Sequence, residues 1–214
     1  MQGTEQKAGR RSGRYRGLAR LRAGLWVAAG VSVLIALAVI YDRGHPPGDP
    51  ASQYASAFGG PFVLTAPDGS SVTDRTLAGK PYAIFFGFTR CPDVCPTSLA
   101  RMARLRKQLG PDGAKFNIVF VSVDPGHDKP ADIGNYVALF GTPIIGLTGT
   151  EAQLAQIKKG YGVYSAKVPQ PGGDYTIDHT AAIYLMTARG EFSGTIDAHE
   201  PDATALAKLK RLIA

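Results

Sequence analysis

Two runs rich in apolar residues in the middle of the chain have the length of buried β-strands. The first, residues 82–88, contains no charged residue, and the second covers residues 115–123. Between them, residues 96–109 carry apolar side chains at helical spacing, while most of the basic side chains lie off that stripe. The stripe consists of Leu99, Met102, Leu105 and Leu109. The pattern predicts a strand, a helix and a second strand of one sheet.

Turn sequences and a helix cap divide the rest of the pattern into shorter elements. Residues 67–70 and 188–190 have turn sequences, and each predicts a hairpin. Thr150 and Gln153 have the spacing of a capping box, which predicts the start of a helix. Helices are expected at residues 130–140, 150–159 and 201–213; extended segments at residues 61–66, 71–73, 144–147, 163–168, 181–187 and 191–197; and a loop at residues 169–174. This order predicts an α/β sandwich whose mixed central sheet is flanked by helices on both faces.

An uncharged segment near the N-terminus, residues 23–41, has a different character. Its 19 residues are apolar all round, and as a helix they would span about 28 Å, close to the thickness of a bilayer core. A buried core helix and a cleavable signal peptide are the alternatives. The run is long for a signal peptide, and no clear cleavage site precedes Asp42. We therefore predict an uncleaved, single-pass transmembrane signal anchor.

Basic residues are concentrated ahead of this segment. Residues 1–22 hold seven basic residues and one acidic residue, whereas the whole chain has a net charge of +7, so the remainder carries only +1. This distribution fits a cytoplasmic tail under the positive-inside rule better than it fits nucleic-acid binding. The expected location is the bacterial inner membrane with the body in the periplasm, and the mitochondrial inner membrane is the alternative.

The remainder divides into a linker and one domain. Residues 42–57 are rich in Gly, Pro and Ser and are expected to form a flexible tether. Residues 58–214 are long enough for one domain with its own hydrophobic core.

The only two cysteines of the chain, Cys91 and Cys95, follow the first predicted strand and precede its helix. A thiol pair at this corner is the layout of a thioredoxin-like fold, and the nearby helix N-terminus favours the thiolate. Outside the cytoplasm the pair is compatible with a disulfide, two free thiols or a metal site. The short loop between them makes a purely structural disulfide unfavourable.

Of the four histidines, His179 is the one that the predicted topology brings toward the thiols, either as a ligand or as a hydrogen-bonded structural residue. His45 falls in the linker, and His127 and His199 are expected to be exposed loop residues. Two thiolates and one imidazole form a soft set of three ligands that suits copper, whereas structural zinc normally needs a fourth ligand.

Four further residues near these ligands have two interpretations each. Asp93 and Asp178 either orient the ligands from outside or cap loops, and Arg90 either favours the Cys91 thiolate or is a solvated charge. Met186 offers a soft thioether, but a methionine within a strand is more often a core residue.

The segment from Phe85 to Thr97, which contains Cys91-Pro92-Asp93-Val94-Cys95-Pro96, resembles the signature of the Sco/SenC family of copper-binding proteins. Ser122-Val123-Asp124-Pro125 and residues 174–185 match two further family segments, and the resemblance covers roughly residues 60–213. It implies a thioredoxin-like fold in which Cys91, Cys95 and His179 bind copper. It also implies a role in assembling the binuclear copper centre of subunit II of cytochrome c oxidase. Arg90 departs from the family, since many relatives have histidine there.

Two functions of different classes follow from these residues. The favoured one is a membrane-anchored copper chaperone that delivers copper to cytochrome c oxidase subunit II, with a periplasmic protein as copper donor. The alternative is a thiol–disulfide oxidoreductase, with Cys91 and Cys95 as its redox-active pair, that keeps the copper-ligand cysteines of the oxidase reduced and is itself supplied by a thiol reductant. A redox sensor or peroxidase has no further feature in its favour. The presence of His179 favours the chaperone, because a reductase needs no imidazole ligand.

Overall fold

The computed structural model describes residues 24–37, 39 and 58–214, which belong to two separate units, residues 1–49 and 50–214. Residues 24–37 and 39 are helical and exposed. None of the helices within the described residues is long and apolar enough to cross a membrane. The predicted anchor also includes residues 23, 38 and 40–41, which lie outside the described residues, as do the predicted basic tail, residues 1–22, and the linker, residues 42–57.

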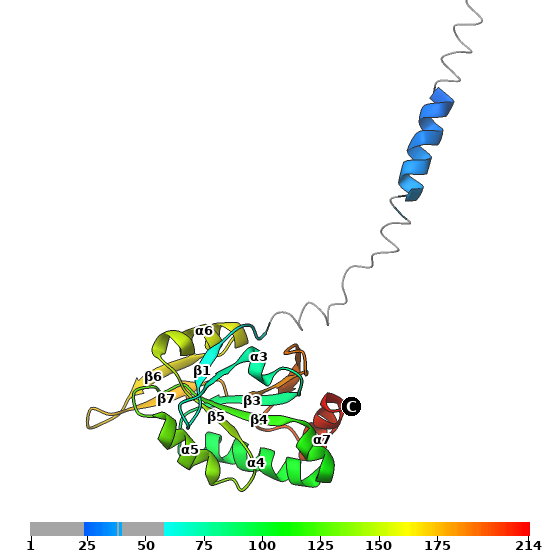
Figure 1. The fold of residues 1–214 in the computed structure, drawn as a ribbon. Helices are drawn as coiled ribbons and strands as arrows, with labels where there is room; N and C mark the ends of the chain where they lie inside the picture. The colour runs from blue at the N-terminus through cyan, green and yellow to red at the C-terminus, as the bar shows by residue number, and fades with distance from the viewer. Residues whose placement is uncertain (1–23, 38, 40–57) are drawn as a thin grey trace, which may run out of the picture. The chain divides into compact units, whose positions relative to one another are not determined.

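A five-stranded mixed sheet forms the centre of the second unit, with the strand order β5-β4-β3-β8-β9 (Figure 1). Its strands are β3 (Tyr82–Gly87), β4 (Asn117–Ser122), β5 (Ile145–Leu147), β8 (Ile183–Met186) and β9 (Phe192–Ile196). The first three run parallel, and β8 is antiparallel to both β3 and β9. All six residues of β3 are buried, as expected for the central strand of a covered sheet. The predicted mixed central sheet is confirmed.

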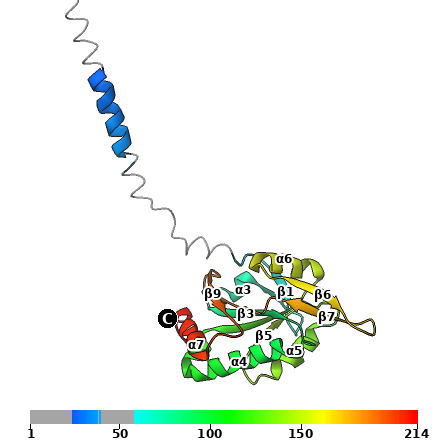
Figure 2. The ribbon, with the colours of Figure 1, turned by 180° about the vertical axis from the view of Figure 1, so that it is seen from behind.

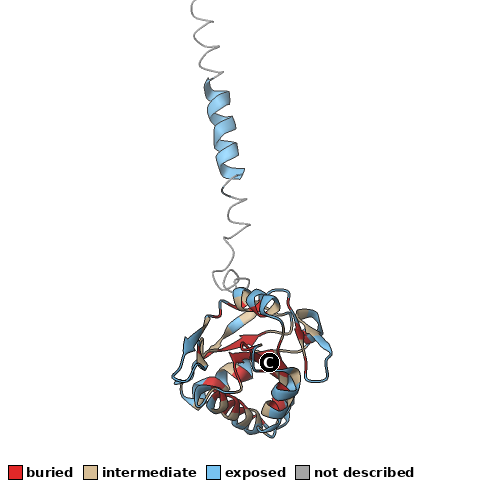
Figure 3. Ribbon diagram, turned by 90° about the vertical axis from the view of Figure 1, so that its left-hand side faces the viewer, coloured by how far each residue is buried: buried red, intermediate tan, exposed pale blue. Residues whose placement is uncertain are grey.

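Helices cover both faces of this sheet. On one face lie α4 (Val94–Gln108), α5 (Pro130–Ala138) and α7 (Asp202–Leu212), and on the other lies α6 (Glu151–Tyr161), as Figures 1 and 2 show. Successive residues of β3 reach opposite layers, because side chains alternate along a strand. Phe85 packs on Phe120, which packs on Tyr136 of α5, whereas Phe86 packs on Tyr161 of α6. Buried residues therefore lie on both sides of the sheet, as the burial colours of the ribbon show (Figure 3).

Two short hairpins lie outside the central sheet. One pairs β1 (Val63–Thr65) with β2 (Ser71–Thr73) around the predicted turn and leads into the short helix α3 (Asp74–Leu77). The other pairs β6 (Ser165–Pro169) with β7 (Tyr175–His179), and in Figure 1 it projects from one side of the domain. The second hairpin carries His179 as the last residue of β7.

Several boundaries differ from the sequence-based expectation. Residues 110–115 form a 3₁₀ turn, η1 (Gly110–Lys115), so β4 starts two residues later than predicted. Helix α4 starts at Val94 rather than at Pro96, because a proline is tolerated within the first turn, where its missing N–H has no intrahelical partner. The pairing of residues 165–169 with 175–179 was not predicted. His179 was expected to enter the strand at 181–187, but it ends a separate strand.

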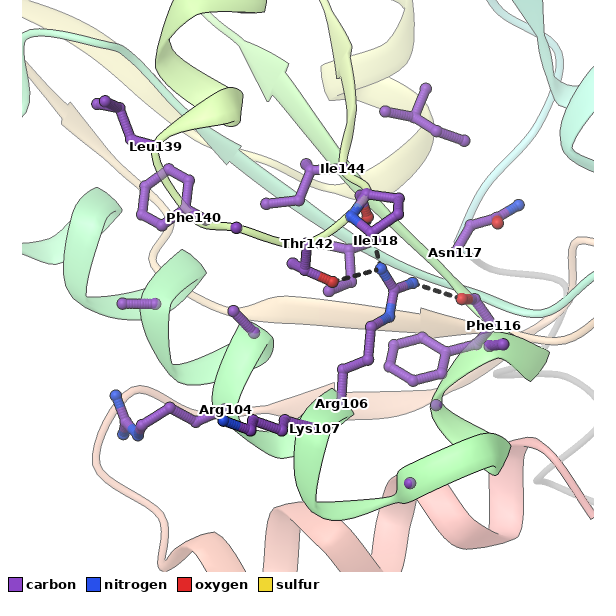
Figure 4. Close-up of a pocket in the computed structure, with 18 of the residues that line it drawn as sticks. Arg104, Arg106, Lys107, Phe116, Asn117, Ile118, Leu139, Phe140, Thr142 and Ile144 are labelled. Carbon is purple, nitrogen blue, oxygen red and sulfur yellow. Dashed lines mark hydrogen bonds between the residues drawn. The ribbon is translucent and has the colours of Figure 1, made fainter.

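A cavity of about 850 Å³ lies at the edge where β3, β4 and β5 begin, next to Lys80, Asn117 and Ile144. Figure 4 shows the guanidinium group of Arg106 within it, bound to oxygen atoms of Thr142, Pro143 and Phe116. No cysteine, histidine or carboxylate is among the described residues that line this cavity. It therefore offers no donor set for a soft metal.

Candidate metal centre

The three residues expected to bind copper meet at one point of the structure. The thiol sulfur atoms of Cys91 and Cys95 and a ring nitrogen of His179 all lie within 4.8 Å of one another. Cys91 belongs to the loop after β3, Cys95 to the first turn of α4, and His179 to the end of β7. Segments more than 80 residues apart in the chain thus form one cluster, at the edge where β3 ends.

Gly87, the last residue of β3, makes room for the buried thiol of Cys95. A methyl group at Gly87 would lie 2.6 Å from Cys95 Sγ and 3.1 Å from the ring of Phe120. Cys95 is fully buried, whereas Cys91 is partly exposed. The first turn of α4 also points a backbone N–H at the partner thiol, since Cys95 N lies 3.5 Å from Cys91 Sγ. Helix N-termini stabilise thiolates in this way.

The pKa values of the two thiols are shifted in opposite directions. A hydrogen bond from the Cys95 thiol lowers the pKa of Cys91 well below its ordinary value, and nearby backbone N–H groups add to this effect against the cost of burial. The hydrogen bond to the Cys91 thiolate, together with burial, raises the pKa of Cys95. The metal-free pair is therefore a Cys91 thiolate that accepts a hydrogen bond from the protonated Cys95 thiol. A soft cation that replaces this proton would bind both sulfur atoms as thiolates.

The ring of His179 is oriented to offer a lone pair to the cluster. Its Nδ1 atom lies 3.0 Å from the carbonyl oxygen of Thr180, and because a carbonyl only accepts, Nδ1 carries the proton. Its Nε2 atom lies 3.5 Å from Cys95 Sγ. The rings of Phe85 and Phe88 pack edge-on against the imidazole and fix its plane. Of the two interpretations of His179, this geometry supports the ligand.

The buried carboxylate of Asp128 holds the loop that carries the cysteines by accepting hydrogen bonds from Thr89. Its Oδ2 atom accepts hydrogen bonds from Thr89 N at 2.9 Å and from the hydroxyl of Ser122, and its Oδ1 atom accepts one from the Thr89 hydroxyl at 2.6 Å. Thr89 stands two residues before Cys91, so Asp128 holds the start of the loop. This role of Asp128 was not predicted, and its only sequence signal is an acidic residue in the loop after β4.

The other candidate residues lie outside the cluster. Asp93 and Asp178 are exposed, and Asp93 accepts a hydrogen bond from the hydroxyl of Thr97. Met186 is completely buried in the core. His199 is exposed, as expected, and His45 lies outside the described residues.

His127 is exposed, as predicted, but it also belongs to a polar network that the sequence did not reveal. Its Nδ1 atom lies 3.0 Å from Asp124 Oδ2 and 2.9 Å from Arg90 Nη2. The Arg90 guanidinium donates to Asp174 at 2.9 Å and is held 3.6 Å from Asp124. Arg90 is exposed, as its interpretation as a solvated charge requires, and its guanidinium also binds carboxylates on two other segments.

A small hollow of about 210 Å³ lies beside the cluster and gives access to it. It is lined by Phe88, Cys91, Pro92, Asp93, Val94, Thr176, Ile177, Asp178, His179 and Ala181. The partly exposed Cys91 and the ring of His179 thus face a surface that another protein can reach, whereas Cys95 lies beneath them.

Comparison with known proteins places this geometry among related chains. The SCO1/SenC family model matches residues 50–214. The curated Arabidopsis thaliana protein "Protein SCO1 homolog 1, mitochondrial" is 38% identical over 141 residues, which are 64% of this chain and 41% of that protein. The chain spans about half the length of the curated relatives it matches.

Solved structures show the same architecture. Copper-bound ScoI of Bradyrhizobium japonicum is 47% identical, with a TM-score of 0.68, and the match covers 73% of this chain and 99% of that one. BsSco, described as a cytochrome c oxidase assembly protein of the Sco family with a disulfide switch, is 26% identical, with a TM-score of 0.58, over 73% of this chain and 94% of that one. The mixed α/β architecture with helices on both faces of the sheet is therefore that of Sco structures.

Proposed function

The chain belongs to the SCO1/SenC family, and from this premise we propose that it is a membrane-anchored copper chaperone. Cys91 and Cys95 bind the ion as thiolates, and His179 completes the site through Nε2. The recipient is subunit II of cytochrome c oxidase, whose binuclear copper centre the protein helps to assemble. The copper ion is the cargo of this reaction, so it must be bound and also given up.

One observation carries this proposal: an imidazole nitrogen without a proton lies 3.5 Å from the thiol of Cys95. Disulfide exchange needs the two sulfur atoms and no imidazole at this position. Cu(I) prefers sulfur and imidazole donors and accepts three of them, and the cluster offers that set. The residues present therefore fit a copper ion.

The partial exposure of the site suits transfer rather than storage. Ligands of a recipient can approach through the hollow beside Cys91 and displace one donor at a time, while the buried Cys95 releases the ion last. A closed structural site would lack this access.

The membrane anchor and location belong to the same proposal. Residues 23–41 hold the chain in the bacterial inner membrane, residues 1–22 stay in the cytoplasm and residues 58–214 lie in the periplasm, with the mitochondrial inner membrane as the alternative. The uncharged run and the basic residues ahead of it support this topology. A protease that is added outside spheroplasts should digest the domain and leave the basic tail protected. Protection of the domain instead would contradict the topology.

Copper titration of the reduced chain tests the function. We expect about one Cu(I) per chain, as a single set of three donors requires. Cys91→Ser or Cys95→Ser should abolish tight binding. His179→Ala should weaken binding by more than the roughly 10- to 100-fold that loss of an outer partner of a metal ligand costs. His199→Ala is the matched control and should bind like the unaltered chain. Equal affinities of the His179→Ala and His199→Ala variants would overturn the assignment.

The second candidate, a thiol–disulfide oxidoreductase, is favoured by the unequal acidity of the two thiols. The Cys91 thiolate would attack a disulfide of the partner, and Cys95 would then displace the partner's cysteine. The products are an oxidised Cys91–Cys95 pair and a reduced partner. The partial exposure of Cys91 and the burial of Cys95 fit an attacking and a resolving residue, respectively.

A further inference from the structure

The position of His179 depends on a hairpin that is not part of the central sheet. Strands β6 and β7 pair only with each other in the described structure. His179 ends β7, whereas both cysteines belong to the β3–α4 corner. The third donor therefore reaches the thiols only if something fixes the hairpin against that corner.

One face of β7 supplies three contacts to the body of the domain. Tyr175, Ile177 and His179 lie on the same face, since side chains alternate along a strand. The Tyr175 hydroxyl donates to Asp124 Oδ1 at 2.6 Å, Ile177 is buried, and His179 faces Cys95. Tyr175 and His179 are about 13 Å apart along the strand. One end of β7 thus holds the donor, and the other end is anchored separately.

Arg90 joins this anchored end to the cysteine loop. It directly precedes Cys91, and its Nη1 atom donates to both carboxylate oxygens of Asp174, at 2.9 and 3.2 Å. Its Nη2 atom donates to the backbone oxygen of Tyr175 at 3.3 Å, and its guanidinium also lies over the Tyr175 ring. The planar guanidinium is therefore held through both of its Nη atoms, which fixes its orientation as well as its distance.

The fourth member of this network, Asp124, ties it to the sheet. Its side chain is completely buried two residues after the end of β4, and Arg90 Nη2 lies 3.6 Å from it. Burial raises the pKa of Asp124, but the hydrogen bonds from Tyr175 and His127 and the charge of Arg90 together lower it below its ordinary value. A buried carboxylate with these partners is a stable anchor, unlike an ion pair that is exposed on both sides.

We propose that Arg90, Asp124, Asp174 and Tyr175, here named the Arg90 clamp, hold the β6–β7 hairpin so that His179 Nε2 stays within reach of the two thiols. Arg90 is then a positioning residue: it acts on the copper ion through His179 and does not bind it. This inference rests on the proposed function of the site.

The clamp acts by ordering the third donor before the metal arrives. A hairpin held at one end only would lose motional freedom when His179 binds the ion, and that loss would reduce affinity. When the Arg90 clamp is formed, the hairpin is already ordered in the folded chain, so less conformational entropy is lost when copper binds. Loss of the clamp should therefore weaken the contribution of His179 and leave the two thiolates nearly unaffected.

The test compares the full chain with its Arg90→Gln variant. Asp174→Asn is a second variant, since Asp174 is exposed and its loss leaves no unbalanced buried charge. Arg189→Gln is the matched control: it removes an exposed arginine–carboxylate pair, with Glu191, from the β8–β9 turn. All variants are measured in the detergent-solubilised full chain.

The first measurement needs no metal. Amide hydrogen exchange at residues 175–179 should become about tenfold faster in Arg90→Gln and in Asp174→Asn, because the hairpin opens more often. It should not change in Arg189→Gln. Unchanged exchange in both clamp variants would overturn the proposal, whether or not the chain binds copper.

The second measurement is a double-mutant cycle on Cu(I) affinity. Arg90→Gln alone should reduce affinity about tenfold, whereas adding Arg90→Gln to His179→Ala should reduce it no further, because the clamp acts only through that imidazole. Additive losses would overturn the positioning role. Failure of the proposed function would look different: the unaltered chain would bind no copper, or His179→Ala would bind it as well as the unaltered chain.

Discussion

The Nε2 atom of His179 and the Sγ atom of Cys95 lie 3.5 Å apart, although 84 residues separate them in the chain. The β6–β7 hairpin, which is not part of the central sheet, thus contacts the buried member of the thiol pair. It also makes one cluster out of residues that differ in exposure, since Cys95 is buried and Cys91 is not. A metal ion that enters from the surface would meet Cys91 and His179 before it reaches Cys95.

The acidity of Cys91 can be measured directly by alkylation. An ordinary thiol with a pKa of about 8.5 is roughly 0.3% thiolate at pH 6, so it reacts slowly there. Because the pKa of Cys91 is lowered, we expect the reduced chain to be alkylated at Cys91 with nearly constant rate from pH 8 down to pH 6. Cys95→Ala removes the hydrogen bond that contributes most to this shift, so the pKa of Cys91 should rise and the reaction at pH 6 should slow.

Bound copper should abolish this reaction, because both sulfur atoms are then ligands. Acidification should restore it, since protons compete with the metal for the thiolates and the imidazole. Mass spectrometry of the alkylated peptides provides both rates. Equal rates with and without copper would contradict the assignment of Cys91 as a ligand.

Gly87 is expected to be intolerant of even one added methyl group. In Gly87→Ala the new Cβ would lie 2.6 Å from Cys95 Sγ, 3.1 Å from Phe120 and 3.2 Å from Phe85, all within the packed core. Overpacking of this kind costs about 1–3 kcal/mol, and the displaced sulfur should also bind copper less tightly. Urea unfolding and copper competition measure the two effects. Gly30→Ala is the control, since its methyl group meets nothing within 4 Å.

How much of this arrangement the sequence predicts depends on how local its signals are. Strand β3 is covered on both faces, so its residues are apolar throughout, and the run at residues 82–88 therefore predicts a buried strand. Thr150 and Gln153 predict the start of α6, because a helix cap depends only on neighbouring residues. The β6–β7 hairpin was not predicted. Strand β6 is largely exposed and β7 buries only Ile177, so neither strand has the apolar pattern that marks a buried strand.

The residues of the candidate site also divide into those that local sequence signals reveal and those that only the structure reveals. Cys91, Cys95 and His179 could be proposed from residue type and order, since the chemistry of a soft metal limits the choice of donors. Asp128 and Arg90 could not, because their roles depend on distances between segments 39 and 84 residues apart. No local pattern distinguishes a carboxylate that binds Thr89 from one that is solvated.

Asp128 should be important for the shape of the cysteine loop. Asp128→Asn replaces an acceptor of three hydrogen bonds by a group that can accept on one side only, so at least one buried donor loses its partner. The expected loss of stability is about 1–3 kcal/mol, with weaker copper binding because Thr89 no longer fixes the start of the loop. Asp132→Asn, at the exposed start of α5, should cost less. Equal losses in the two variants would argue against a special role for Asp128.

Cells can decide between the two candidate functions, because a chaperone needs all three ligands and a reductase needs only the two thiols. A His179→Ala strain should therefore lose cytochrome c oxidase activity at low copper about as severely as a Cys91→Ser strain. Added copper should partly restore activity in cells without the protein, since mass action substitutes for delivery, and a thiol reductant should do so less well. Immunoblots must show that each variant accumulates to the level of the unaltered chain. Near-normal activity of the His179→Ala strain, with none in the cysteine variant, would mean that thiol exchange rather than metal transfer is the function of this site.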